Sequence, residues 1–491
     1  MKKRLLLLLL AGCAGGPDPD RPADPPNIVY ILADDLGYGD LSCANRDSKI
    51  ATPNIDRLAS QGMLFRDAHS GSAVCTPTRY GILTGRYAWR TRLQQGVLEG
   101  FSPHLIDPRR PTVASLLRSR GYHSACIGKW HLGFEWAGKP DQVDYTQPIR
   151  NGPLAAGFDA FYGISASLDM PPYLWIENDR SVGVPTTTKT WIRKGPAHKD
   201  FEAVDVLPTI TKKAVEYLDQ RAREDRPFFL YFPLNAPHTP ILPSPEFQGK
   251  SGLGAYGDFV LQVDATVGEI LKTLDRNGQA GRTLVVFTSD NGCSPSADLP
   301  ALLRQGHNPN YSFRGAKADI FEGGHHIPFI ARWPGKIRAG ATCDDPICLT
   351  DLIATCAEIL GIPLPDEAGE DSVSLLPDFL ETARGPIREA TVHHSVNGSF
   401  AIRQGKWKLE LCPDSGGWSD PRPGKADASK LPAVQLYDLS EDLGERRNRQ
   451  AEHPDVVDRL TQLLKGYVEK GRSTPGRPQP NDAAVQILKG R

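Results

Sequence analysis

A cysteine at position 75 stands in a pattern whose residue types and spacing suit chemistry on an anion. Cys75 is followed by Pro77 and Arg79, two and four residues later. Pro77 is typical of the first position of a helix, where a missing N–H costs nothing, and Thr76 is a candidate helix cap. Gly85 is typical of a helix end. The pattern therefore predicts that Cys75 lies at the positive end of a helix dipole, where an anion binds favourably.

Chemically useful side chains follow four predicted buried strands. The apolar runs 28–33, 124–128, 228–232 and 284–288 are typical of strands that are buried on both faces. The residues that follow these runs are Asp34 and Asp35, Lys129 and His131, His238, and Asp290 and Asn291. Ligands of open α/β sheets bind at the carboxyl ends of the strands, so we expect these side chains to converge on one site.

Each of these residues has a simpler explanation when it is considered alone. Asp34 and Asp35 also suit a turn that caps a helix. Lys129 and His131 have the spacing of a solvated strand face, and a single histidine such as His238 is more often packed or on the surface. Their common position after predicted strands is what favours a functional site.

Oxygen atoms dominate the ligands that the sequence offers to a cation. Adjacent carboxylates after a buried strand are costly unless something binds them. Asp34, Asp35, Asp290 and Asn291 all provide oxygen ligands, which favours calcium or magnesium over zinc or copper. We expect calcium rather than magnesium, because calcium accepts flexible coordination.

The order of predicted elements indicates an α/β fold. Strands alternate with helices predicted over 112–120, 207–223, 260–277 and 349–360, which predicts a large, mixed and mostly parallel sheet flanked by helices. Residues 134–200 lack clear periodicity and indicate a loop-rich insertion. We expect a catalytic domain over 27–385, a smaller unit with short strands and a helix over 386–475, and a flexible tail over 476–491.

The first residues have the composition of a bacterial export signal. Three basic residues precede an apolar run over 5–10, which is too short to span a bilayer. The sequence Leu10-Ala11-Gly12-Cys13 looks like a lipoprotein box, so we expect residues 1–12 to be removed and Cys13 to be lipidated. Residues 13–26 then form a tether. This predicts an exported lipoprotein held by its lipid anchor in the periplasm or at the cell surface; an ordinary secretory signal is the alternative.

Composition excludes some other classes of function. The chain has 491 residues and a net charge of -1, so nothing favours a nucleic-acid partner. Nine cysteines are too few for a disulfide framework at this length. Cys343 and Cys348 are close enough in sequence to pair, a question that the sequence leaves open.

Taken together, these segments resemble the sulfatase family over about residues 27–470. The matching motifs are Cys-x-Pro-x-Arg at 75–79, Gly-Lys-Trp-His at 128–131, Pro-His at 237–238, Ser-Asp-Asn-Gly at 289–292 and Phe-Arg-Gly-Ala-Lys at 313–317. The resemblance implies an alkaline-phosphatase-like α/β domain, followed by a small antiparallel sheet with a helix. One position departs from the family: an arginine usually precedes the hydrophobic–proline pair, and this chain has His326 there.

The resemblance also implies the nucleophile and its maturation. Cys75 is expected to be oxidised after synthesis by a formylglycine-generating enzyme, and the hydrated aldehyde is expected to attack the sulfur of a sulfate ester. The implied metal ligands are Asp34, Asp35, Asp290 and Asn291, and the implied ion is calcium. A plain cysteine or serine lacks the second hydroxyl that would release the sulfate.

The remaining catalytic roles are likewise implied by the family. Arg79 and Lys129 are expected to hold the formylglycine oxygens. Lys317 and His238 are expected to bind the sulfate, with His238 as the general acid that protonates the departing alcohol. His131 is expected to remove a proton from the second hydroxyl, which expels sulfate and restores the aldehyde.

The substrate is expected to be a sulfated carbohydrate. Residues 163–175 resemble bacterial sulfatases related to N-acetylgalactosamine-6-sulfatase, which suggests 6-O-sulfated N-acetylgalactosamine or galactose. In this segment Asp169 is expected to accept hydrogen bonds from sugar hydroxyls, and Tyr173 to pack on a sugar face; folding of the loop is the alternative role. Two other functions stay open, a phosphonate or phosphodiester hydrolase of the same superfamily and an unmatured glycan-binding surface lipoprotein.

Overall fold

A computed structural model describes residues 25–425 and 427–488 of the chain. The predicted export signal and Cys13 lie outside these residues, so the expectations for the leader and the lipid anchor are not addressed by the structure. Within the described part, none of the helices combines the length and the apolar composition that crossing a bilayer requires.

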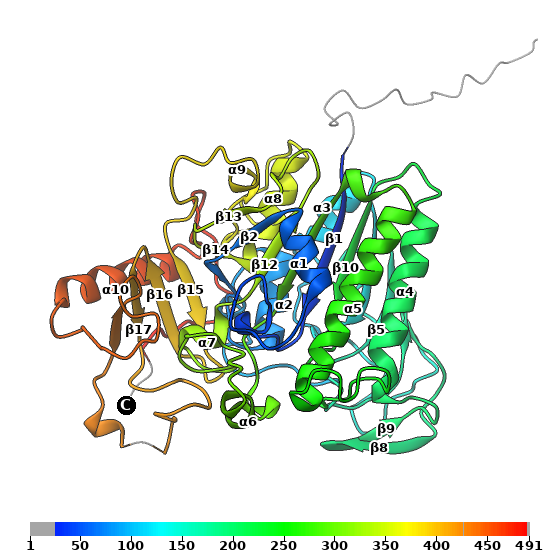
Figure 1. Ribbon diagram of the computed structural model, residues 1–491, viewed down its shortest axis with the longest axis horizontal. Helices are drawn as coiled ribbons and strands as arrows, with labels where there is room; N and C mark the ends of the chain where they lie inside the picture. The colour runs from blue at the N-terminus through cyan, green and yellow to red at the C-terminus, as the bar shows by residue number, and fades with distance from the viewer. Residues whose placement is uncertain (1–24, 426, 489–491) are drawn as a thin grey trace, which may run out of the picture.

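A ten-stranded mixed sheet runs through the large domain (Figure 1), as the sequence predicted. Its strand order is β13-β2-β12-β11-β1-β10-β4-β5-β6-β7, and the five central strands from β11 to β5 are parallel. The strands are β1 (Asn27–Ala33), β2 (Met63–Phe65), β4 (His123–Lys129), β5 (Ala160–Ile164), β6 (Ile176–Glu177), β7 (Arg180–Ser181), β10 (Phe228–Pro233), β11 (Thr283–Ser289), β12 (Phe329–Arg332) and β13 (Ala341–Cys343).

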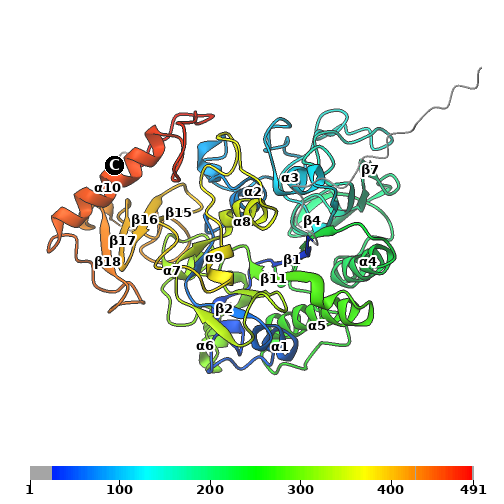
Figure 2. The ribbon, with the colours of Figure 1, turned by 90° about the horizontal axis from the view of Figure 1, so that it is seen from above.

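Helices cover both faces of this sheet (Figure 2), because successive residues of its central strands point to opposite sides. Val29 and Ile31 of β1 belong to a core shared with α1 (Pro53–Ser60), α4 (Val206–Arg221) and α5 (Gly254–Arg276). Ile28 and Tyr30 belong to a second core, shared with α2 (Cys75–Thr84), α3 (Val113–Ser119) and α8 (Leu352–Ile359). Two apolar layers therefore fix the sheet and leave the ends of its strands for polar residues.

A smaller unit follows the large domain, as predicted, and lies to the left in Figure 1. It is a four-stranded antiparallel sheet covered by α10 (Pro454–Glu469). Its strands are β15 (Thr391–His394), β16 (Phe400–Gln404), β17 (Trp407–Glu410) and β18 (Gln435–Asp438). The remaining short elements are β3 (Ala68–His69), β8 (Thr187–Trp191), β9 (Arg193–Ala197), β14 (Ile347–Cys348), α6 (Leu299–Arg304), α7 (Glu322–His325) and α9 (Leu376–Phe379).

One detail of the structure differs from the sequence-based expectations, and another answers a question that the sequence left open. The segment predicted to be a flexible tail makes specific contacts: Asp482 forms an ion pair with buried Arg86, and its backbone N–H donates to Arg90 O at 2.7 Å. Periodicity gave no sign of these contacts, because their partners lie about 390 residues earlier. Cys343 and Cys348 are both free, so they do not form a disulfide.

Candidate active site

The first residue of α2 is Cys75, which places its thiol at the N-terminus of a ten-residue helix. Cys75 is buried, and its Sγ lies 3.7 Å from Asp34 Oδ1. Gly85 ends the helix in the left-handed conformation, with φ 66°, as predicted. The expectation that Thr76 caps the helix is wrong: Val74 holds the cap position, and the Thr76 hydroxyl accepts a hydrogen bond from Leu98 N at 3.2 Å.

The four predicted metal ligands lie together at the carboxyl ends of β1 and β11. Ala33 and Ser289 are paired across these parallel strands, so the polar residues that follow each strand are neighbours. The Asp35 N–H donates to Asp290 Oδ1 at 3.2 Å, and Asn291 Nδ2 donates to Asp35 Oδ1 at 2.8 Å.

The electrostatics of this group favour a bound cation. Asp34, Asp35, Asp290 and Asn291 are all buried. Burial and the neighbouring Asp34 raise the pKa of Asp290 to about 6. Within the described residues, Asn291 Oδ1 is buried without a hydrogen-bond partner. Three buried carboxylates and an orphaned amide oxygen are the donors that a hard cation such as calcium or magnesium takes, so the residues present fit the predicted metal site.

Three basic side chains from separate segments complete the charge balance of the site. Lys129 Nζ lies 2.5 Å from Asp34 Oδ2, and Lys317 Nζ lies 2.7 Å from Asp35 Oδ1. Arg79, one helical turn after Cys75, donates to Asp290 Oδ2 and to the Lys129 carbonyl oxygen. These cations hold the pKa of Asp34 well below its usual range even though burial acts in the opposite direction. Asp34 is therefore ionised, in a pocket whose three cations also attract an anion.

The two predicted catalytic histidines are present, and each has one ring nitrogen engaged by a backbone carbonyl. His131 Nε2 donates to Leu98 O at 2.7 Å, and its buried Nδ1 has no partner among the described residues. His238 Nδ1 donates to Thr239 O at 2.5 Å, while its Nε2 lies 3.7 Å from Asp35 Oδ2. A carbonyl oxygen accepts only, so in His131 the proton sits on Nε2 and Nδ1 carries the free lone pair.

Comparison with known proteins agrees with this arrangement. A family model described as Sulfatase matches residues 26–362, more than half of the chain. The chain belongs to the sulfatase family. It is therefore a sulfuric ester hydrolase, and its sheet has the architecture of the alkaline phosphatase superfamily.

Individual relatives extend the match over nearly the whole chain. An N-acetylgalactosamine-6-O-sulfatase of Bacteroides thetaiotaomicron is 35% identical over 93% of this chain and 96% of its own length. Human arylsulfatase A is 34% identical over 99% of this chain and 95% of its own length. A solved B. thetaiotaomicron structure, reported with the metabolism of multiple glycosaminoglycans, has a TM-score of 0.80 and 34% identity, with coverage of 90% of this chain and 99% of that one.

Backbone strain in this sulfatase is found at two of the predicted site residues. Asp35 and His131 adopt left-handed backbone conformations, with φ 66° and φ 57°. Such conformations cost a non-glycine residue about 1–3 kcal/mol and persist where the surroundings hold them. Here the Asp35 side chain is held by Lys317 and Asn291, and the His131 ring by Leu98 O. Sequence reasoning missed Leu98, because a backbone carbonyl leaves no residue-type signal.

A second set of residues that sequence reasoning missed supports the loop that follows β1 in the sulfatase. Asp40 is buried and accepts hydrogen bonds at Oδ2 from the Gly37 N–H and from the Tyr256 hydroxyl, at 2.8 and 2.5 Å. Its Oδ1 lies 2.9 Å from His307 Nε2. Asp40 belongs to the segment Asp34-Asp35-Leu36-Gly37-Tyr38-Gly39-Asp40. The presence of a third carboxylate shortly after Asp34 and Asp35 was the one signal that the sequence offered for this role.

The predicted substrate residues lie in the insertion, with their polar groups partly engaged. Asp169 Oδ2 lies 2.7 Å from Arg193 Nη1, and Asp169 Oδ1 has no partner among the described residues. The structure does not support the expectation that Tyr173 packs on a sugar. Its side chain is buried with 1% exposure, its ring contacts Trp191, and its hydroxyl donates to Arg193 O. A ring enclosed in this way has no free face for a ligand.

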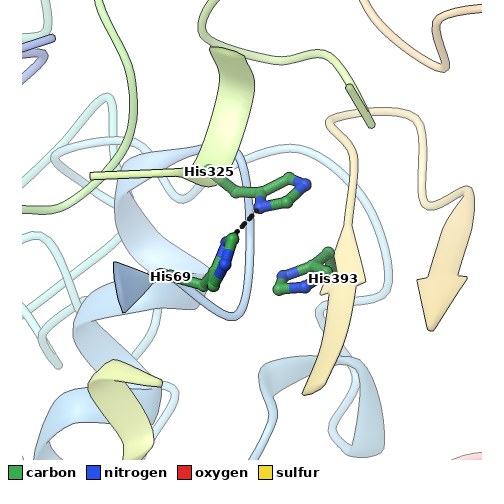
Figure 3. Close-up of side chains that lie close together, drawn as sticks. All are labelled: His69, His325 and His393. Atoms are coloured by element: carbon green, nitrogen blue, oxygen red, sulfur yellow. Dashed lines mark hydrogen bonds between the residues drawn. The ribbon is translucent and has the colours of Figure 1, made fainter. Parts of the chain in front are cut away.

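Three buried histidines of the sulfatase, outside the predicted site, lie close together (Figure 3). His69 of β3, His325 of α7 and His393 of β15 come from three elements, and His69 Nδ1 lies 3.1 Å from His325 Nδ1. The rings of His325 and His393 stack 3.8 Å apart at 7°, so their in-plane lone pairs run parallel and do not converge on an ion. Each ring nitrogen already has a partner in the protein.

These histidines connect the small sheet to the segment that leads to Cys75. His393 Nδ1 donates to Ser70 O at 3.1 Å, and the Ser70 N–H donates to His325 O at 2.9 Å. The neighbouring His394 O accepts from the Ala73 N–H. The cluster therefore has a structural role, which is to hold the approach to the nucleophile against β15.

Proposed function

We propose that this sulfatase removes 6-O-sulfate from N-acetylgalactosamine or galactose units of a glycan, with formylglycine at position 75 and a calcium ion. The observation that carries the proposal is the convergence of Cys75, the four oxygen ligands and the basic and imidazole groups at one edge of the sheet. The printed names of the relatives support the choice of sugar, since they include an N-acetylgalactosamine-6-O-sulfatase and a protein of glycosaminoglycan metabolism.

The state of Cys75 favours modification over direct use of its thiol. Burial raises the pKa of the Cys75 thiol to about 12, so the reactive thiolate is scarce near neutral pH. Oxidation by a formylglycine-generating enzyme would supply a hydrated aldehyde whose two hydroxyls serve attack and release. The helix N-terminus, Arg79 and Lys129 all place positive charge around this position, which suits an oxygen nucleophile and a bound sulfate.

The calcium ion is assigned to Asp34, Asp35, Asp290 and Asn291. When bound, it would act as a Lewis acid that polarises an oxygen of the nucleophile or of the sulfate. Arg79 orients Asp290, and Lys317 together with Asn291 orients Asp35. The protein thus fixes the ligands by contacts of its own.

The remaining steps use groups whose protonation follows from their contacts. Burial and the cations Lys129 and Arg79 hold the pKa of His131 well below its usual value, so its free Nδ1 can accept a proton from the nucleophile. Lys317 binds the sulfate oxygens, and Arg79 and Lys129 hold the oxygens of the formylglycine. His238 Nε2 lies 3.7 Å from Asp35 Oδ2, and because the Nδ1 proton is donated to Thr239 O, Nε2 can protonate the departing alcohol when the ring is the imidazolium.

The proposal also includes the cellular location of the protein. The basic start, the short apolar run and Leu10-Ala11-Gly12-Cys13 favour export from a bacterial cell and anchoring through lipid on Cys13. A surface or periplasmic anchor suits an enzyme whose substrate is an extracellular carbohydrate.

A panel of defined esters tests the proposal. We expect turnover of 6-sulfated N-acetylgalactosamine or galactose to exceed that of the 4-sulfated isomers by at least about tenfold, because a hydroxyl-binding site rejects a misplaced partner. Matched phosphate and phosphonate esters in the same panel test the alternative of a phosphohydrolase. Preference for those esters, or for no sugar isomer, would contradict the proposal.

A further inference from the structure

A second pocket of about 940 Å³ lies where the large domain meets the small sheet. Its walls come from residues 38–47 after β1, from 311–313, from His326 after α7, and from Arg403 and 439–443 of the small unit. The volume is that of a site for a molecule of several rings, and boundaries between domains are common positions for such sites. None of the catalytic residues described above lines it.

Aromatic rings form much of the floor of this pocket. Tyr38 packs against Tyr311 and Phe313, with ring centroids 5.8 and 5.4 Å apart. Tyr311 and Leu443 are exposed, by 37% and 43%. Tyr38 and Phe313 are buried, so Tyr311 is the ring of this group that a ligand can reach, and an exposed tyrosine suits the apolar face and hydroxyls of a sugar.

Tyr311 is held in a conformation that folding alone does not favour. Its φ is 55°, in the left-handed region, which costs a bulky residue about 1–2 kcal/mol. An exposed residue in such a turn is ordinarily glycine or asparagine. A large ring in a strained and exposed position points to a use for that ring.

His326, the position that departs from the sulfatase pattern, shapes the same pocket. Its ring stacks on Phe313 with centroids 4.0 Å apart at 21°. Its nitrogens lie 2.9 Å from Glu322 Oε2 and 2.9 Å from Arg66 O. The imidazole ring of His326 thus holds the Phe313 ring against the wall of the pocket.

The charges that line the pocket favour an uncharged ligand. Arg66 pairs with Asp344, Arg403 pairs with Asp67, and Glu322 pairs with Lys408 behind the wall. Of the ionised lining groups, Arg46 and Asp47 remain, one of each sign. Together they offer a donor and an acceptor for sugar hydroxyls but no net attraction for an anionic polymer.

The pocket and the catalytic site share two chain segments. Tyr38 follows the metal ligand Asp35 by three residues, and Phe313 precedes Lys317 by four. The chain reaches at most about 3.6 Å per residue, so each wall residue has its Cα within about 14 Å of the Cα of its catalytic partner. The two sites are therefore separated by no more than the length of a glycan of several units.

We propose that this pocket binds an uncharged sugar unit of the same glycan whose sulfate ester is hydrolysed at position 75. The inference rests on the proposed function for the identity of the substrate. The inference assigns the preference for a polymeric substrate over a small ester to Tyr311 and Arg46. It also gives His326 the role of supporting the pocket wall.

Binding of an uncharged oligosaccharide tests the pocket independently of catalysis. The probe is a hexasaccharide of alternating galactose and N-acetylglucosamine, titrated into the protein by calorimetry. We expect Tyr311→Gly to weaken binding about tenfold without lowering the melting temperature, because glycine relieves the left-handed strain. Tyr311→Phe keeps the ring and should stay within about twofold of the original affinity. Leu380→Ala, at a position with 39% exposure outside the pocket, is the matched control.

Kinetics supply the second readout. The same hexasaccharide with sulfate at O6 of its terminal galactose is compared with 4-nitrophenyl sulfate. We expect Tyr311→Gly and Arg46→Ala to raise KM for the sulfated hexasaccharide about five- to tenfold and to leave kcat/KM for the small ester unchanged. No binding of the uncharged hexasaccharide, unchanged binding in Tyr311→Gly, or equal losses on both esters would overturn the inference. If the chain hydrolysed no sulfate ester, the proposed function would fail, and the calorimetry would still decide the pocket.

Discussion

Arg79 and Asp290 form an ion pair that is fully buried in the active site. Nε and Nη2 of Arg79 lie 3.1 and 2.8 Å from Asp290 Oδ2. Arg79 belongs to the Cys-x-Pro-x-Arg pattern of α2, whereas Asp290 follows β11 and is a predicted metal ligand. The pair therefore links the helix that begins at Cys75 to the predicted metal ligands, and it leaves Asp290 Oδ1 to accept from the Asp35 N–H.

Removal of Asp290 should cost both calcium and stability. We expect Asp290→Asn to abolish calcium binding measured by calorimetry on metal-free protein, because an amide supplies no charge to the ion. Asp290→Ala should also lower the free energy of unfolding, because buried Arg79 keeps only Asp34, at 3.6 Å, as a carboxylate partner. Asp378→Asn changes a buried carboxyl elsewhere and should leave calcium affinity as it is. Equal calcium affinity in Asp290→Asn would argue against the assigned ligands.

Position 75 should carry an aldehyde in protein made together with a maturation enzyme. We expect the tryptic peptide that contains residue 75 to have the mass of formylglycine, and Cys75→Ala to lose nearly all turnover. Because the thiol is buried and its pKa is raised to about 12, unmodified protein should be inactive as well. Full activity in a sample whose mass spectrum shows only cysteine would remove this mechanism.

Asp169 should matter more for a sugar ester than for a small aromatic one. Its Oδ1 is buried and has no hydrogen-bond partner among the described residues, while Oδ2 is held by Arg193. We expect Asp169→Ala to lower kcat/KM for 6-sulfated N-acetylgalactosamine at least about tenfold more than for 4-nitrophenyl sulfate. Arg193→Ala breaks the same ion pair and leaves the carboxylate in place, so it reports on loop folding. If the two variants behave alike on both esters, Asp169 has only a structural role.

Low pH should lower the stability of the folded protein through its buried histidine cluster. Burial, together with His69 and Lys408, holds the pKa of His393 well below 6.5, so the ring is neutral in the folded chain. The unfolded chain takes up a proton near pH 6.5, so this contribution to stability is complete above that pH and is lost as the pH falls below it.

The His393→Asn variant should accordingly unfold with a smaller pH dependence. We expect the slope of the unfolding free energy below pH 6.5 to fall by up to about 1.4 kcal/mol per pH unit, measured by urea titration from pH 7.5 to 5. His198→Asn, a change at a partly exposed histidine, should keep the original slope. An unchanged slope in His393→Asn would show that other groups govern acid sensitivity.

The lipid anchor is tested at Cys13. We expect the original protein in the membrane fraction of cells that process lipoproteins, and Cys13→Ser in the soluble fraction, since one thiol carries the lipid. Equal solubility of both forms would favour an ordinary secretory signal.

The sequence alone was enough to predict the central sheet and the convergence of most candidate site residues at one edge of it. Runs such as 28–33 and 284–288 are apolar on both faces, which only a buried strand of an α/β sheet requires, and polar residues directly after such strands must meet at one edge. Asp34, Asp290 and Lys129 were predicted in this way. The family motifs added Cys75 and Arg79 to the same site.

Tertiary structure decided the contacts between residues that are distant in sequence. The tautomer of His131 depends on Leu98 O, and the Thr76 hydroxyl, which was expected to cap α2, instead accepts a hydrogen bond from Leu98 N. Tyr173 proved to be enclosed by Trp191 and Arg193. These outcomes depend on which loop packs against which, and neither periodicity nor residue type encodes that choice. The pocket at Tyr311 is of the same kind, because its walls come from segments that only the packing of two sheets brings together.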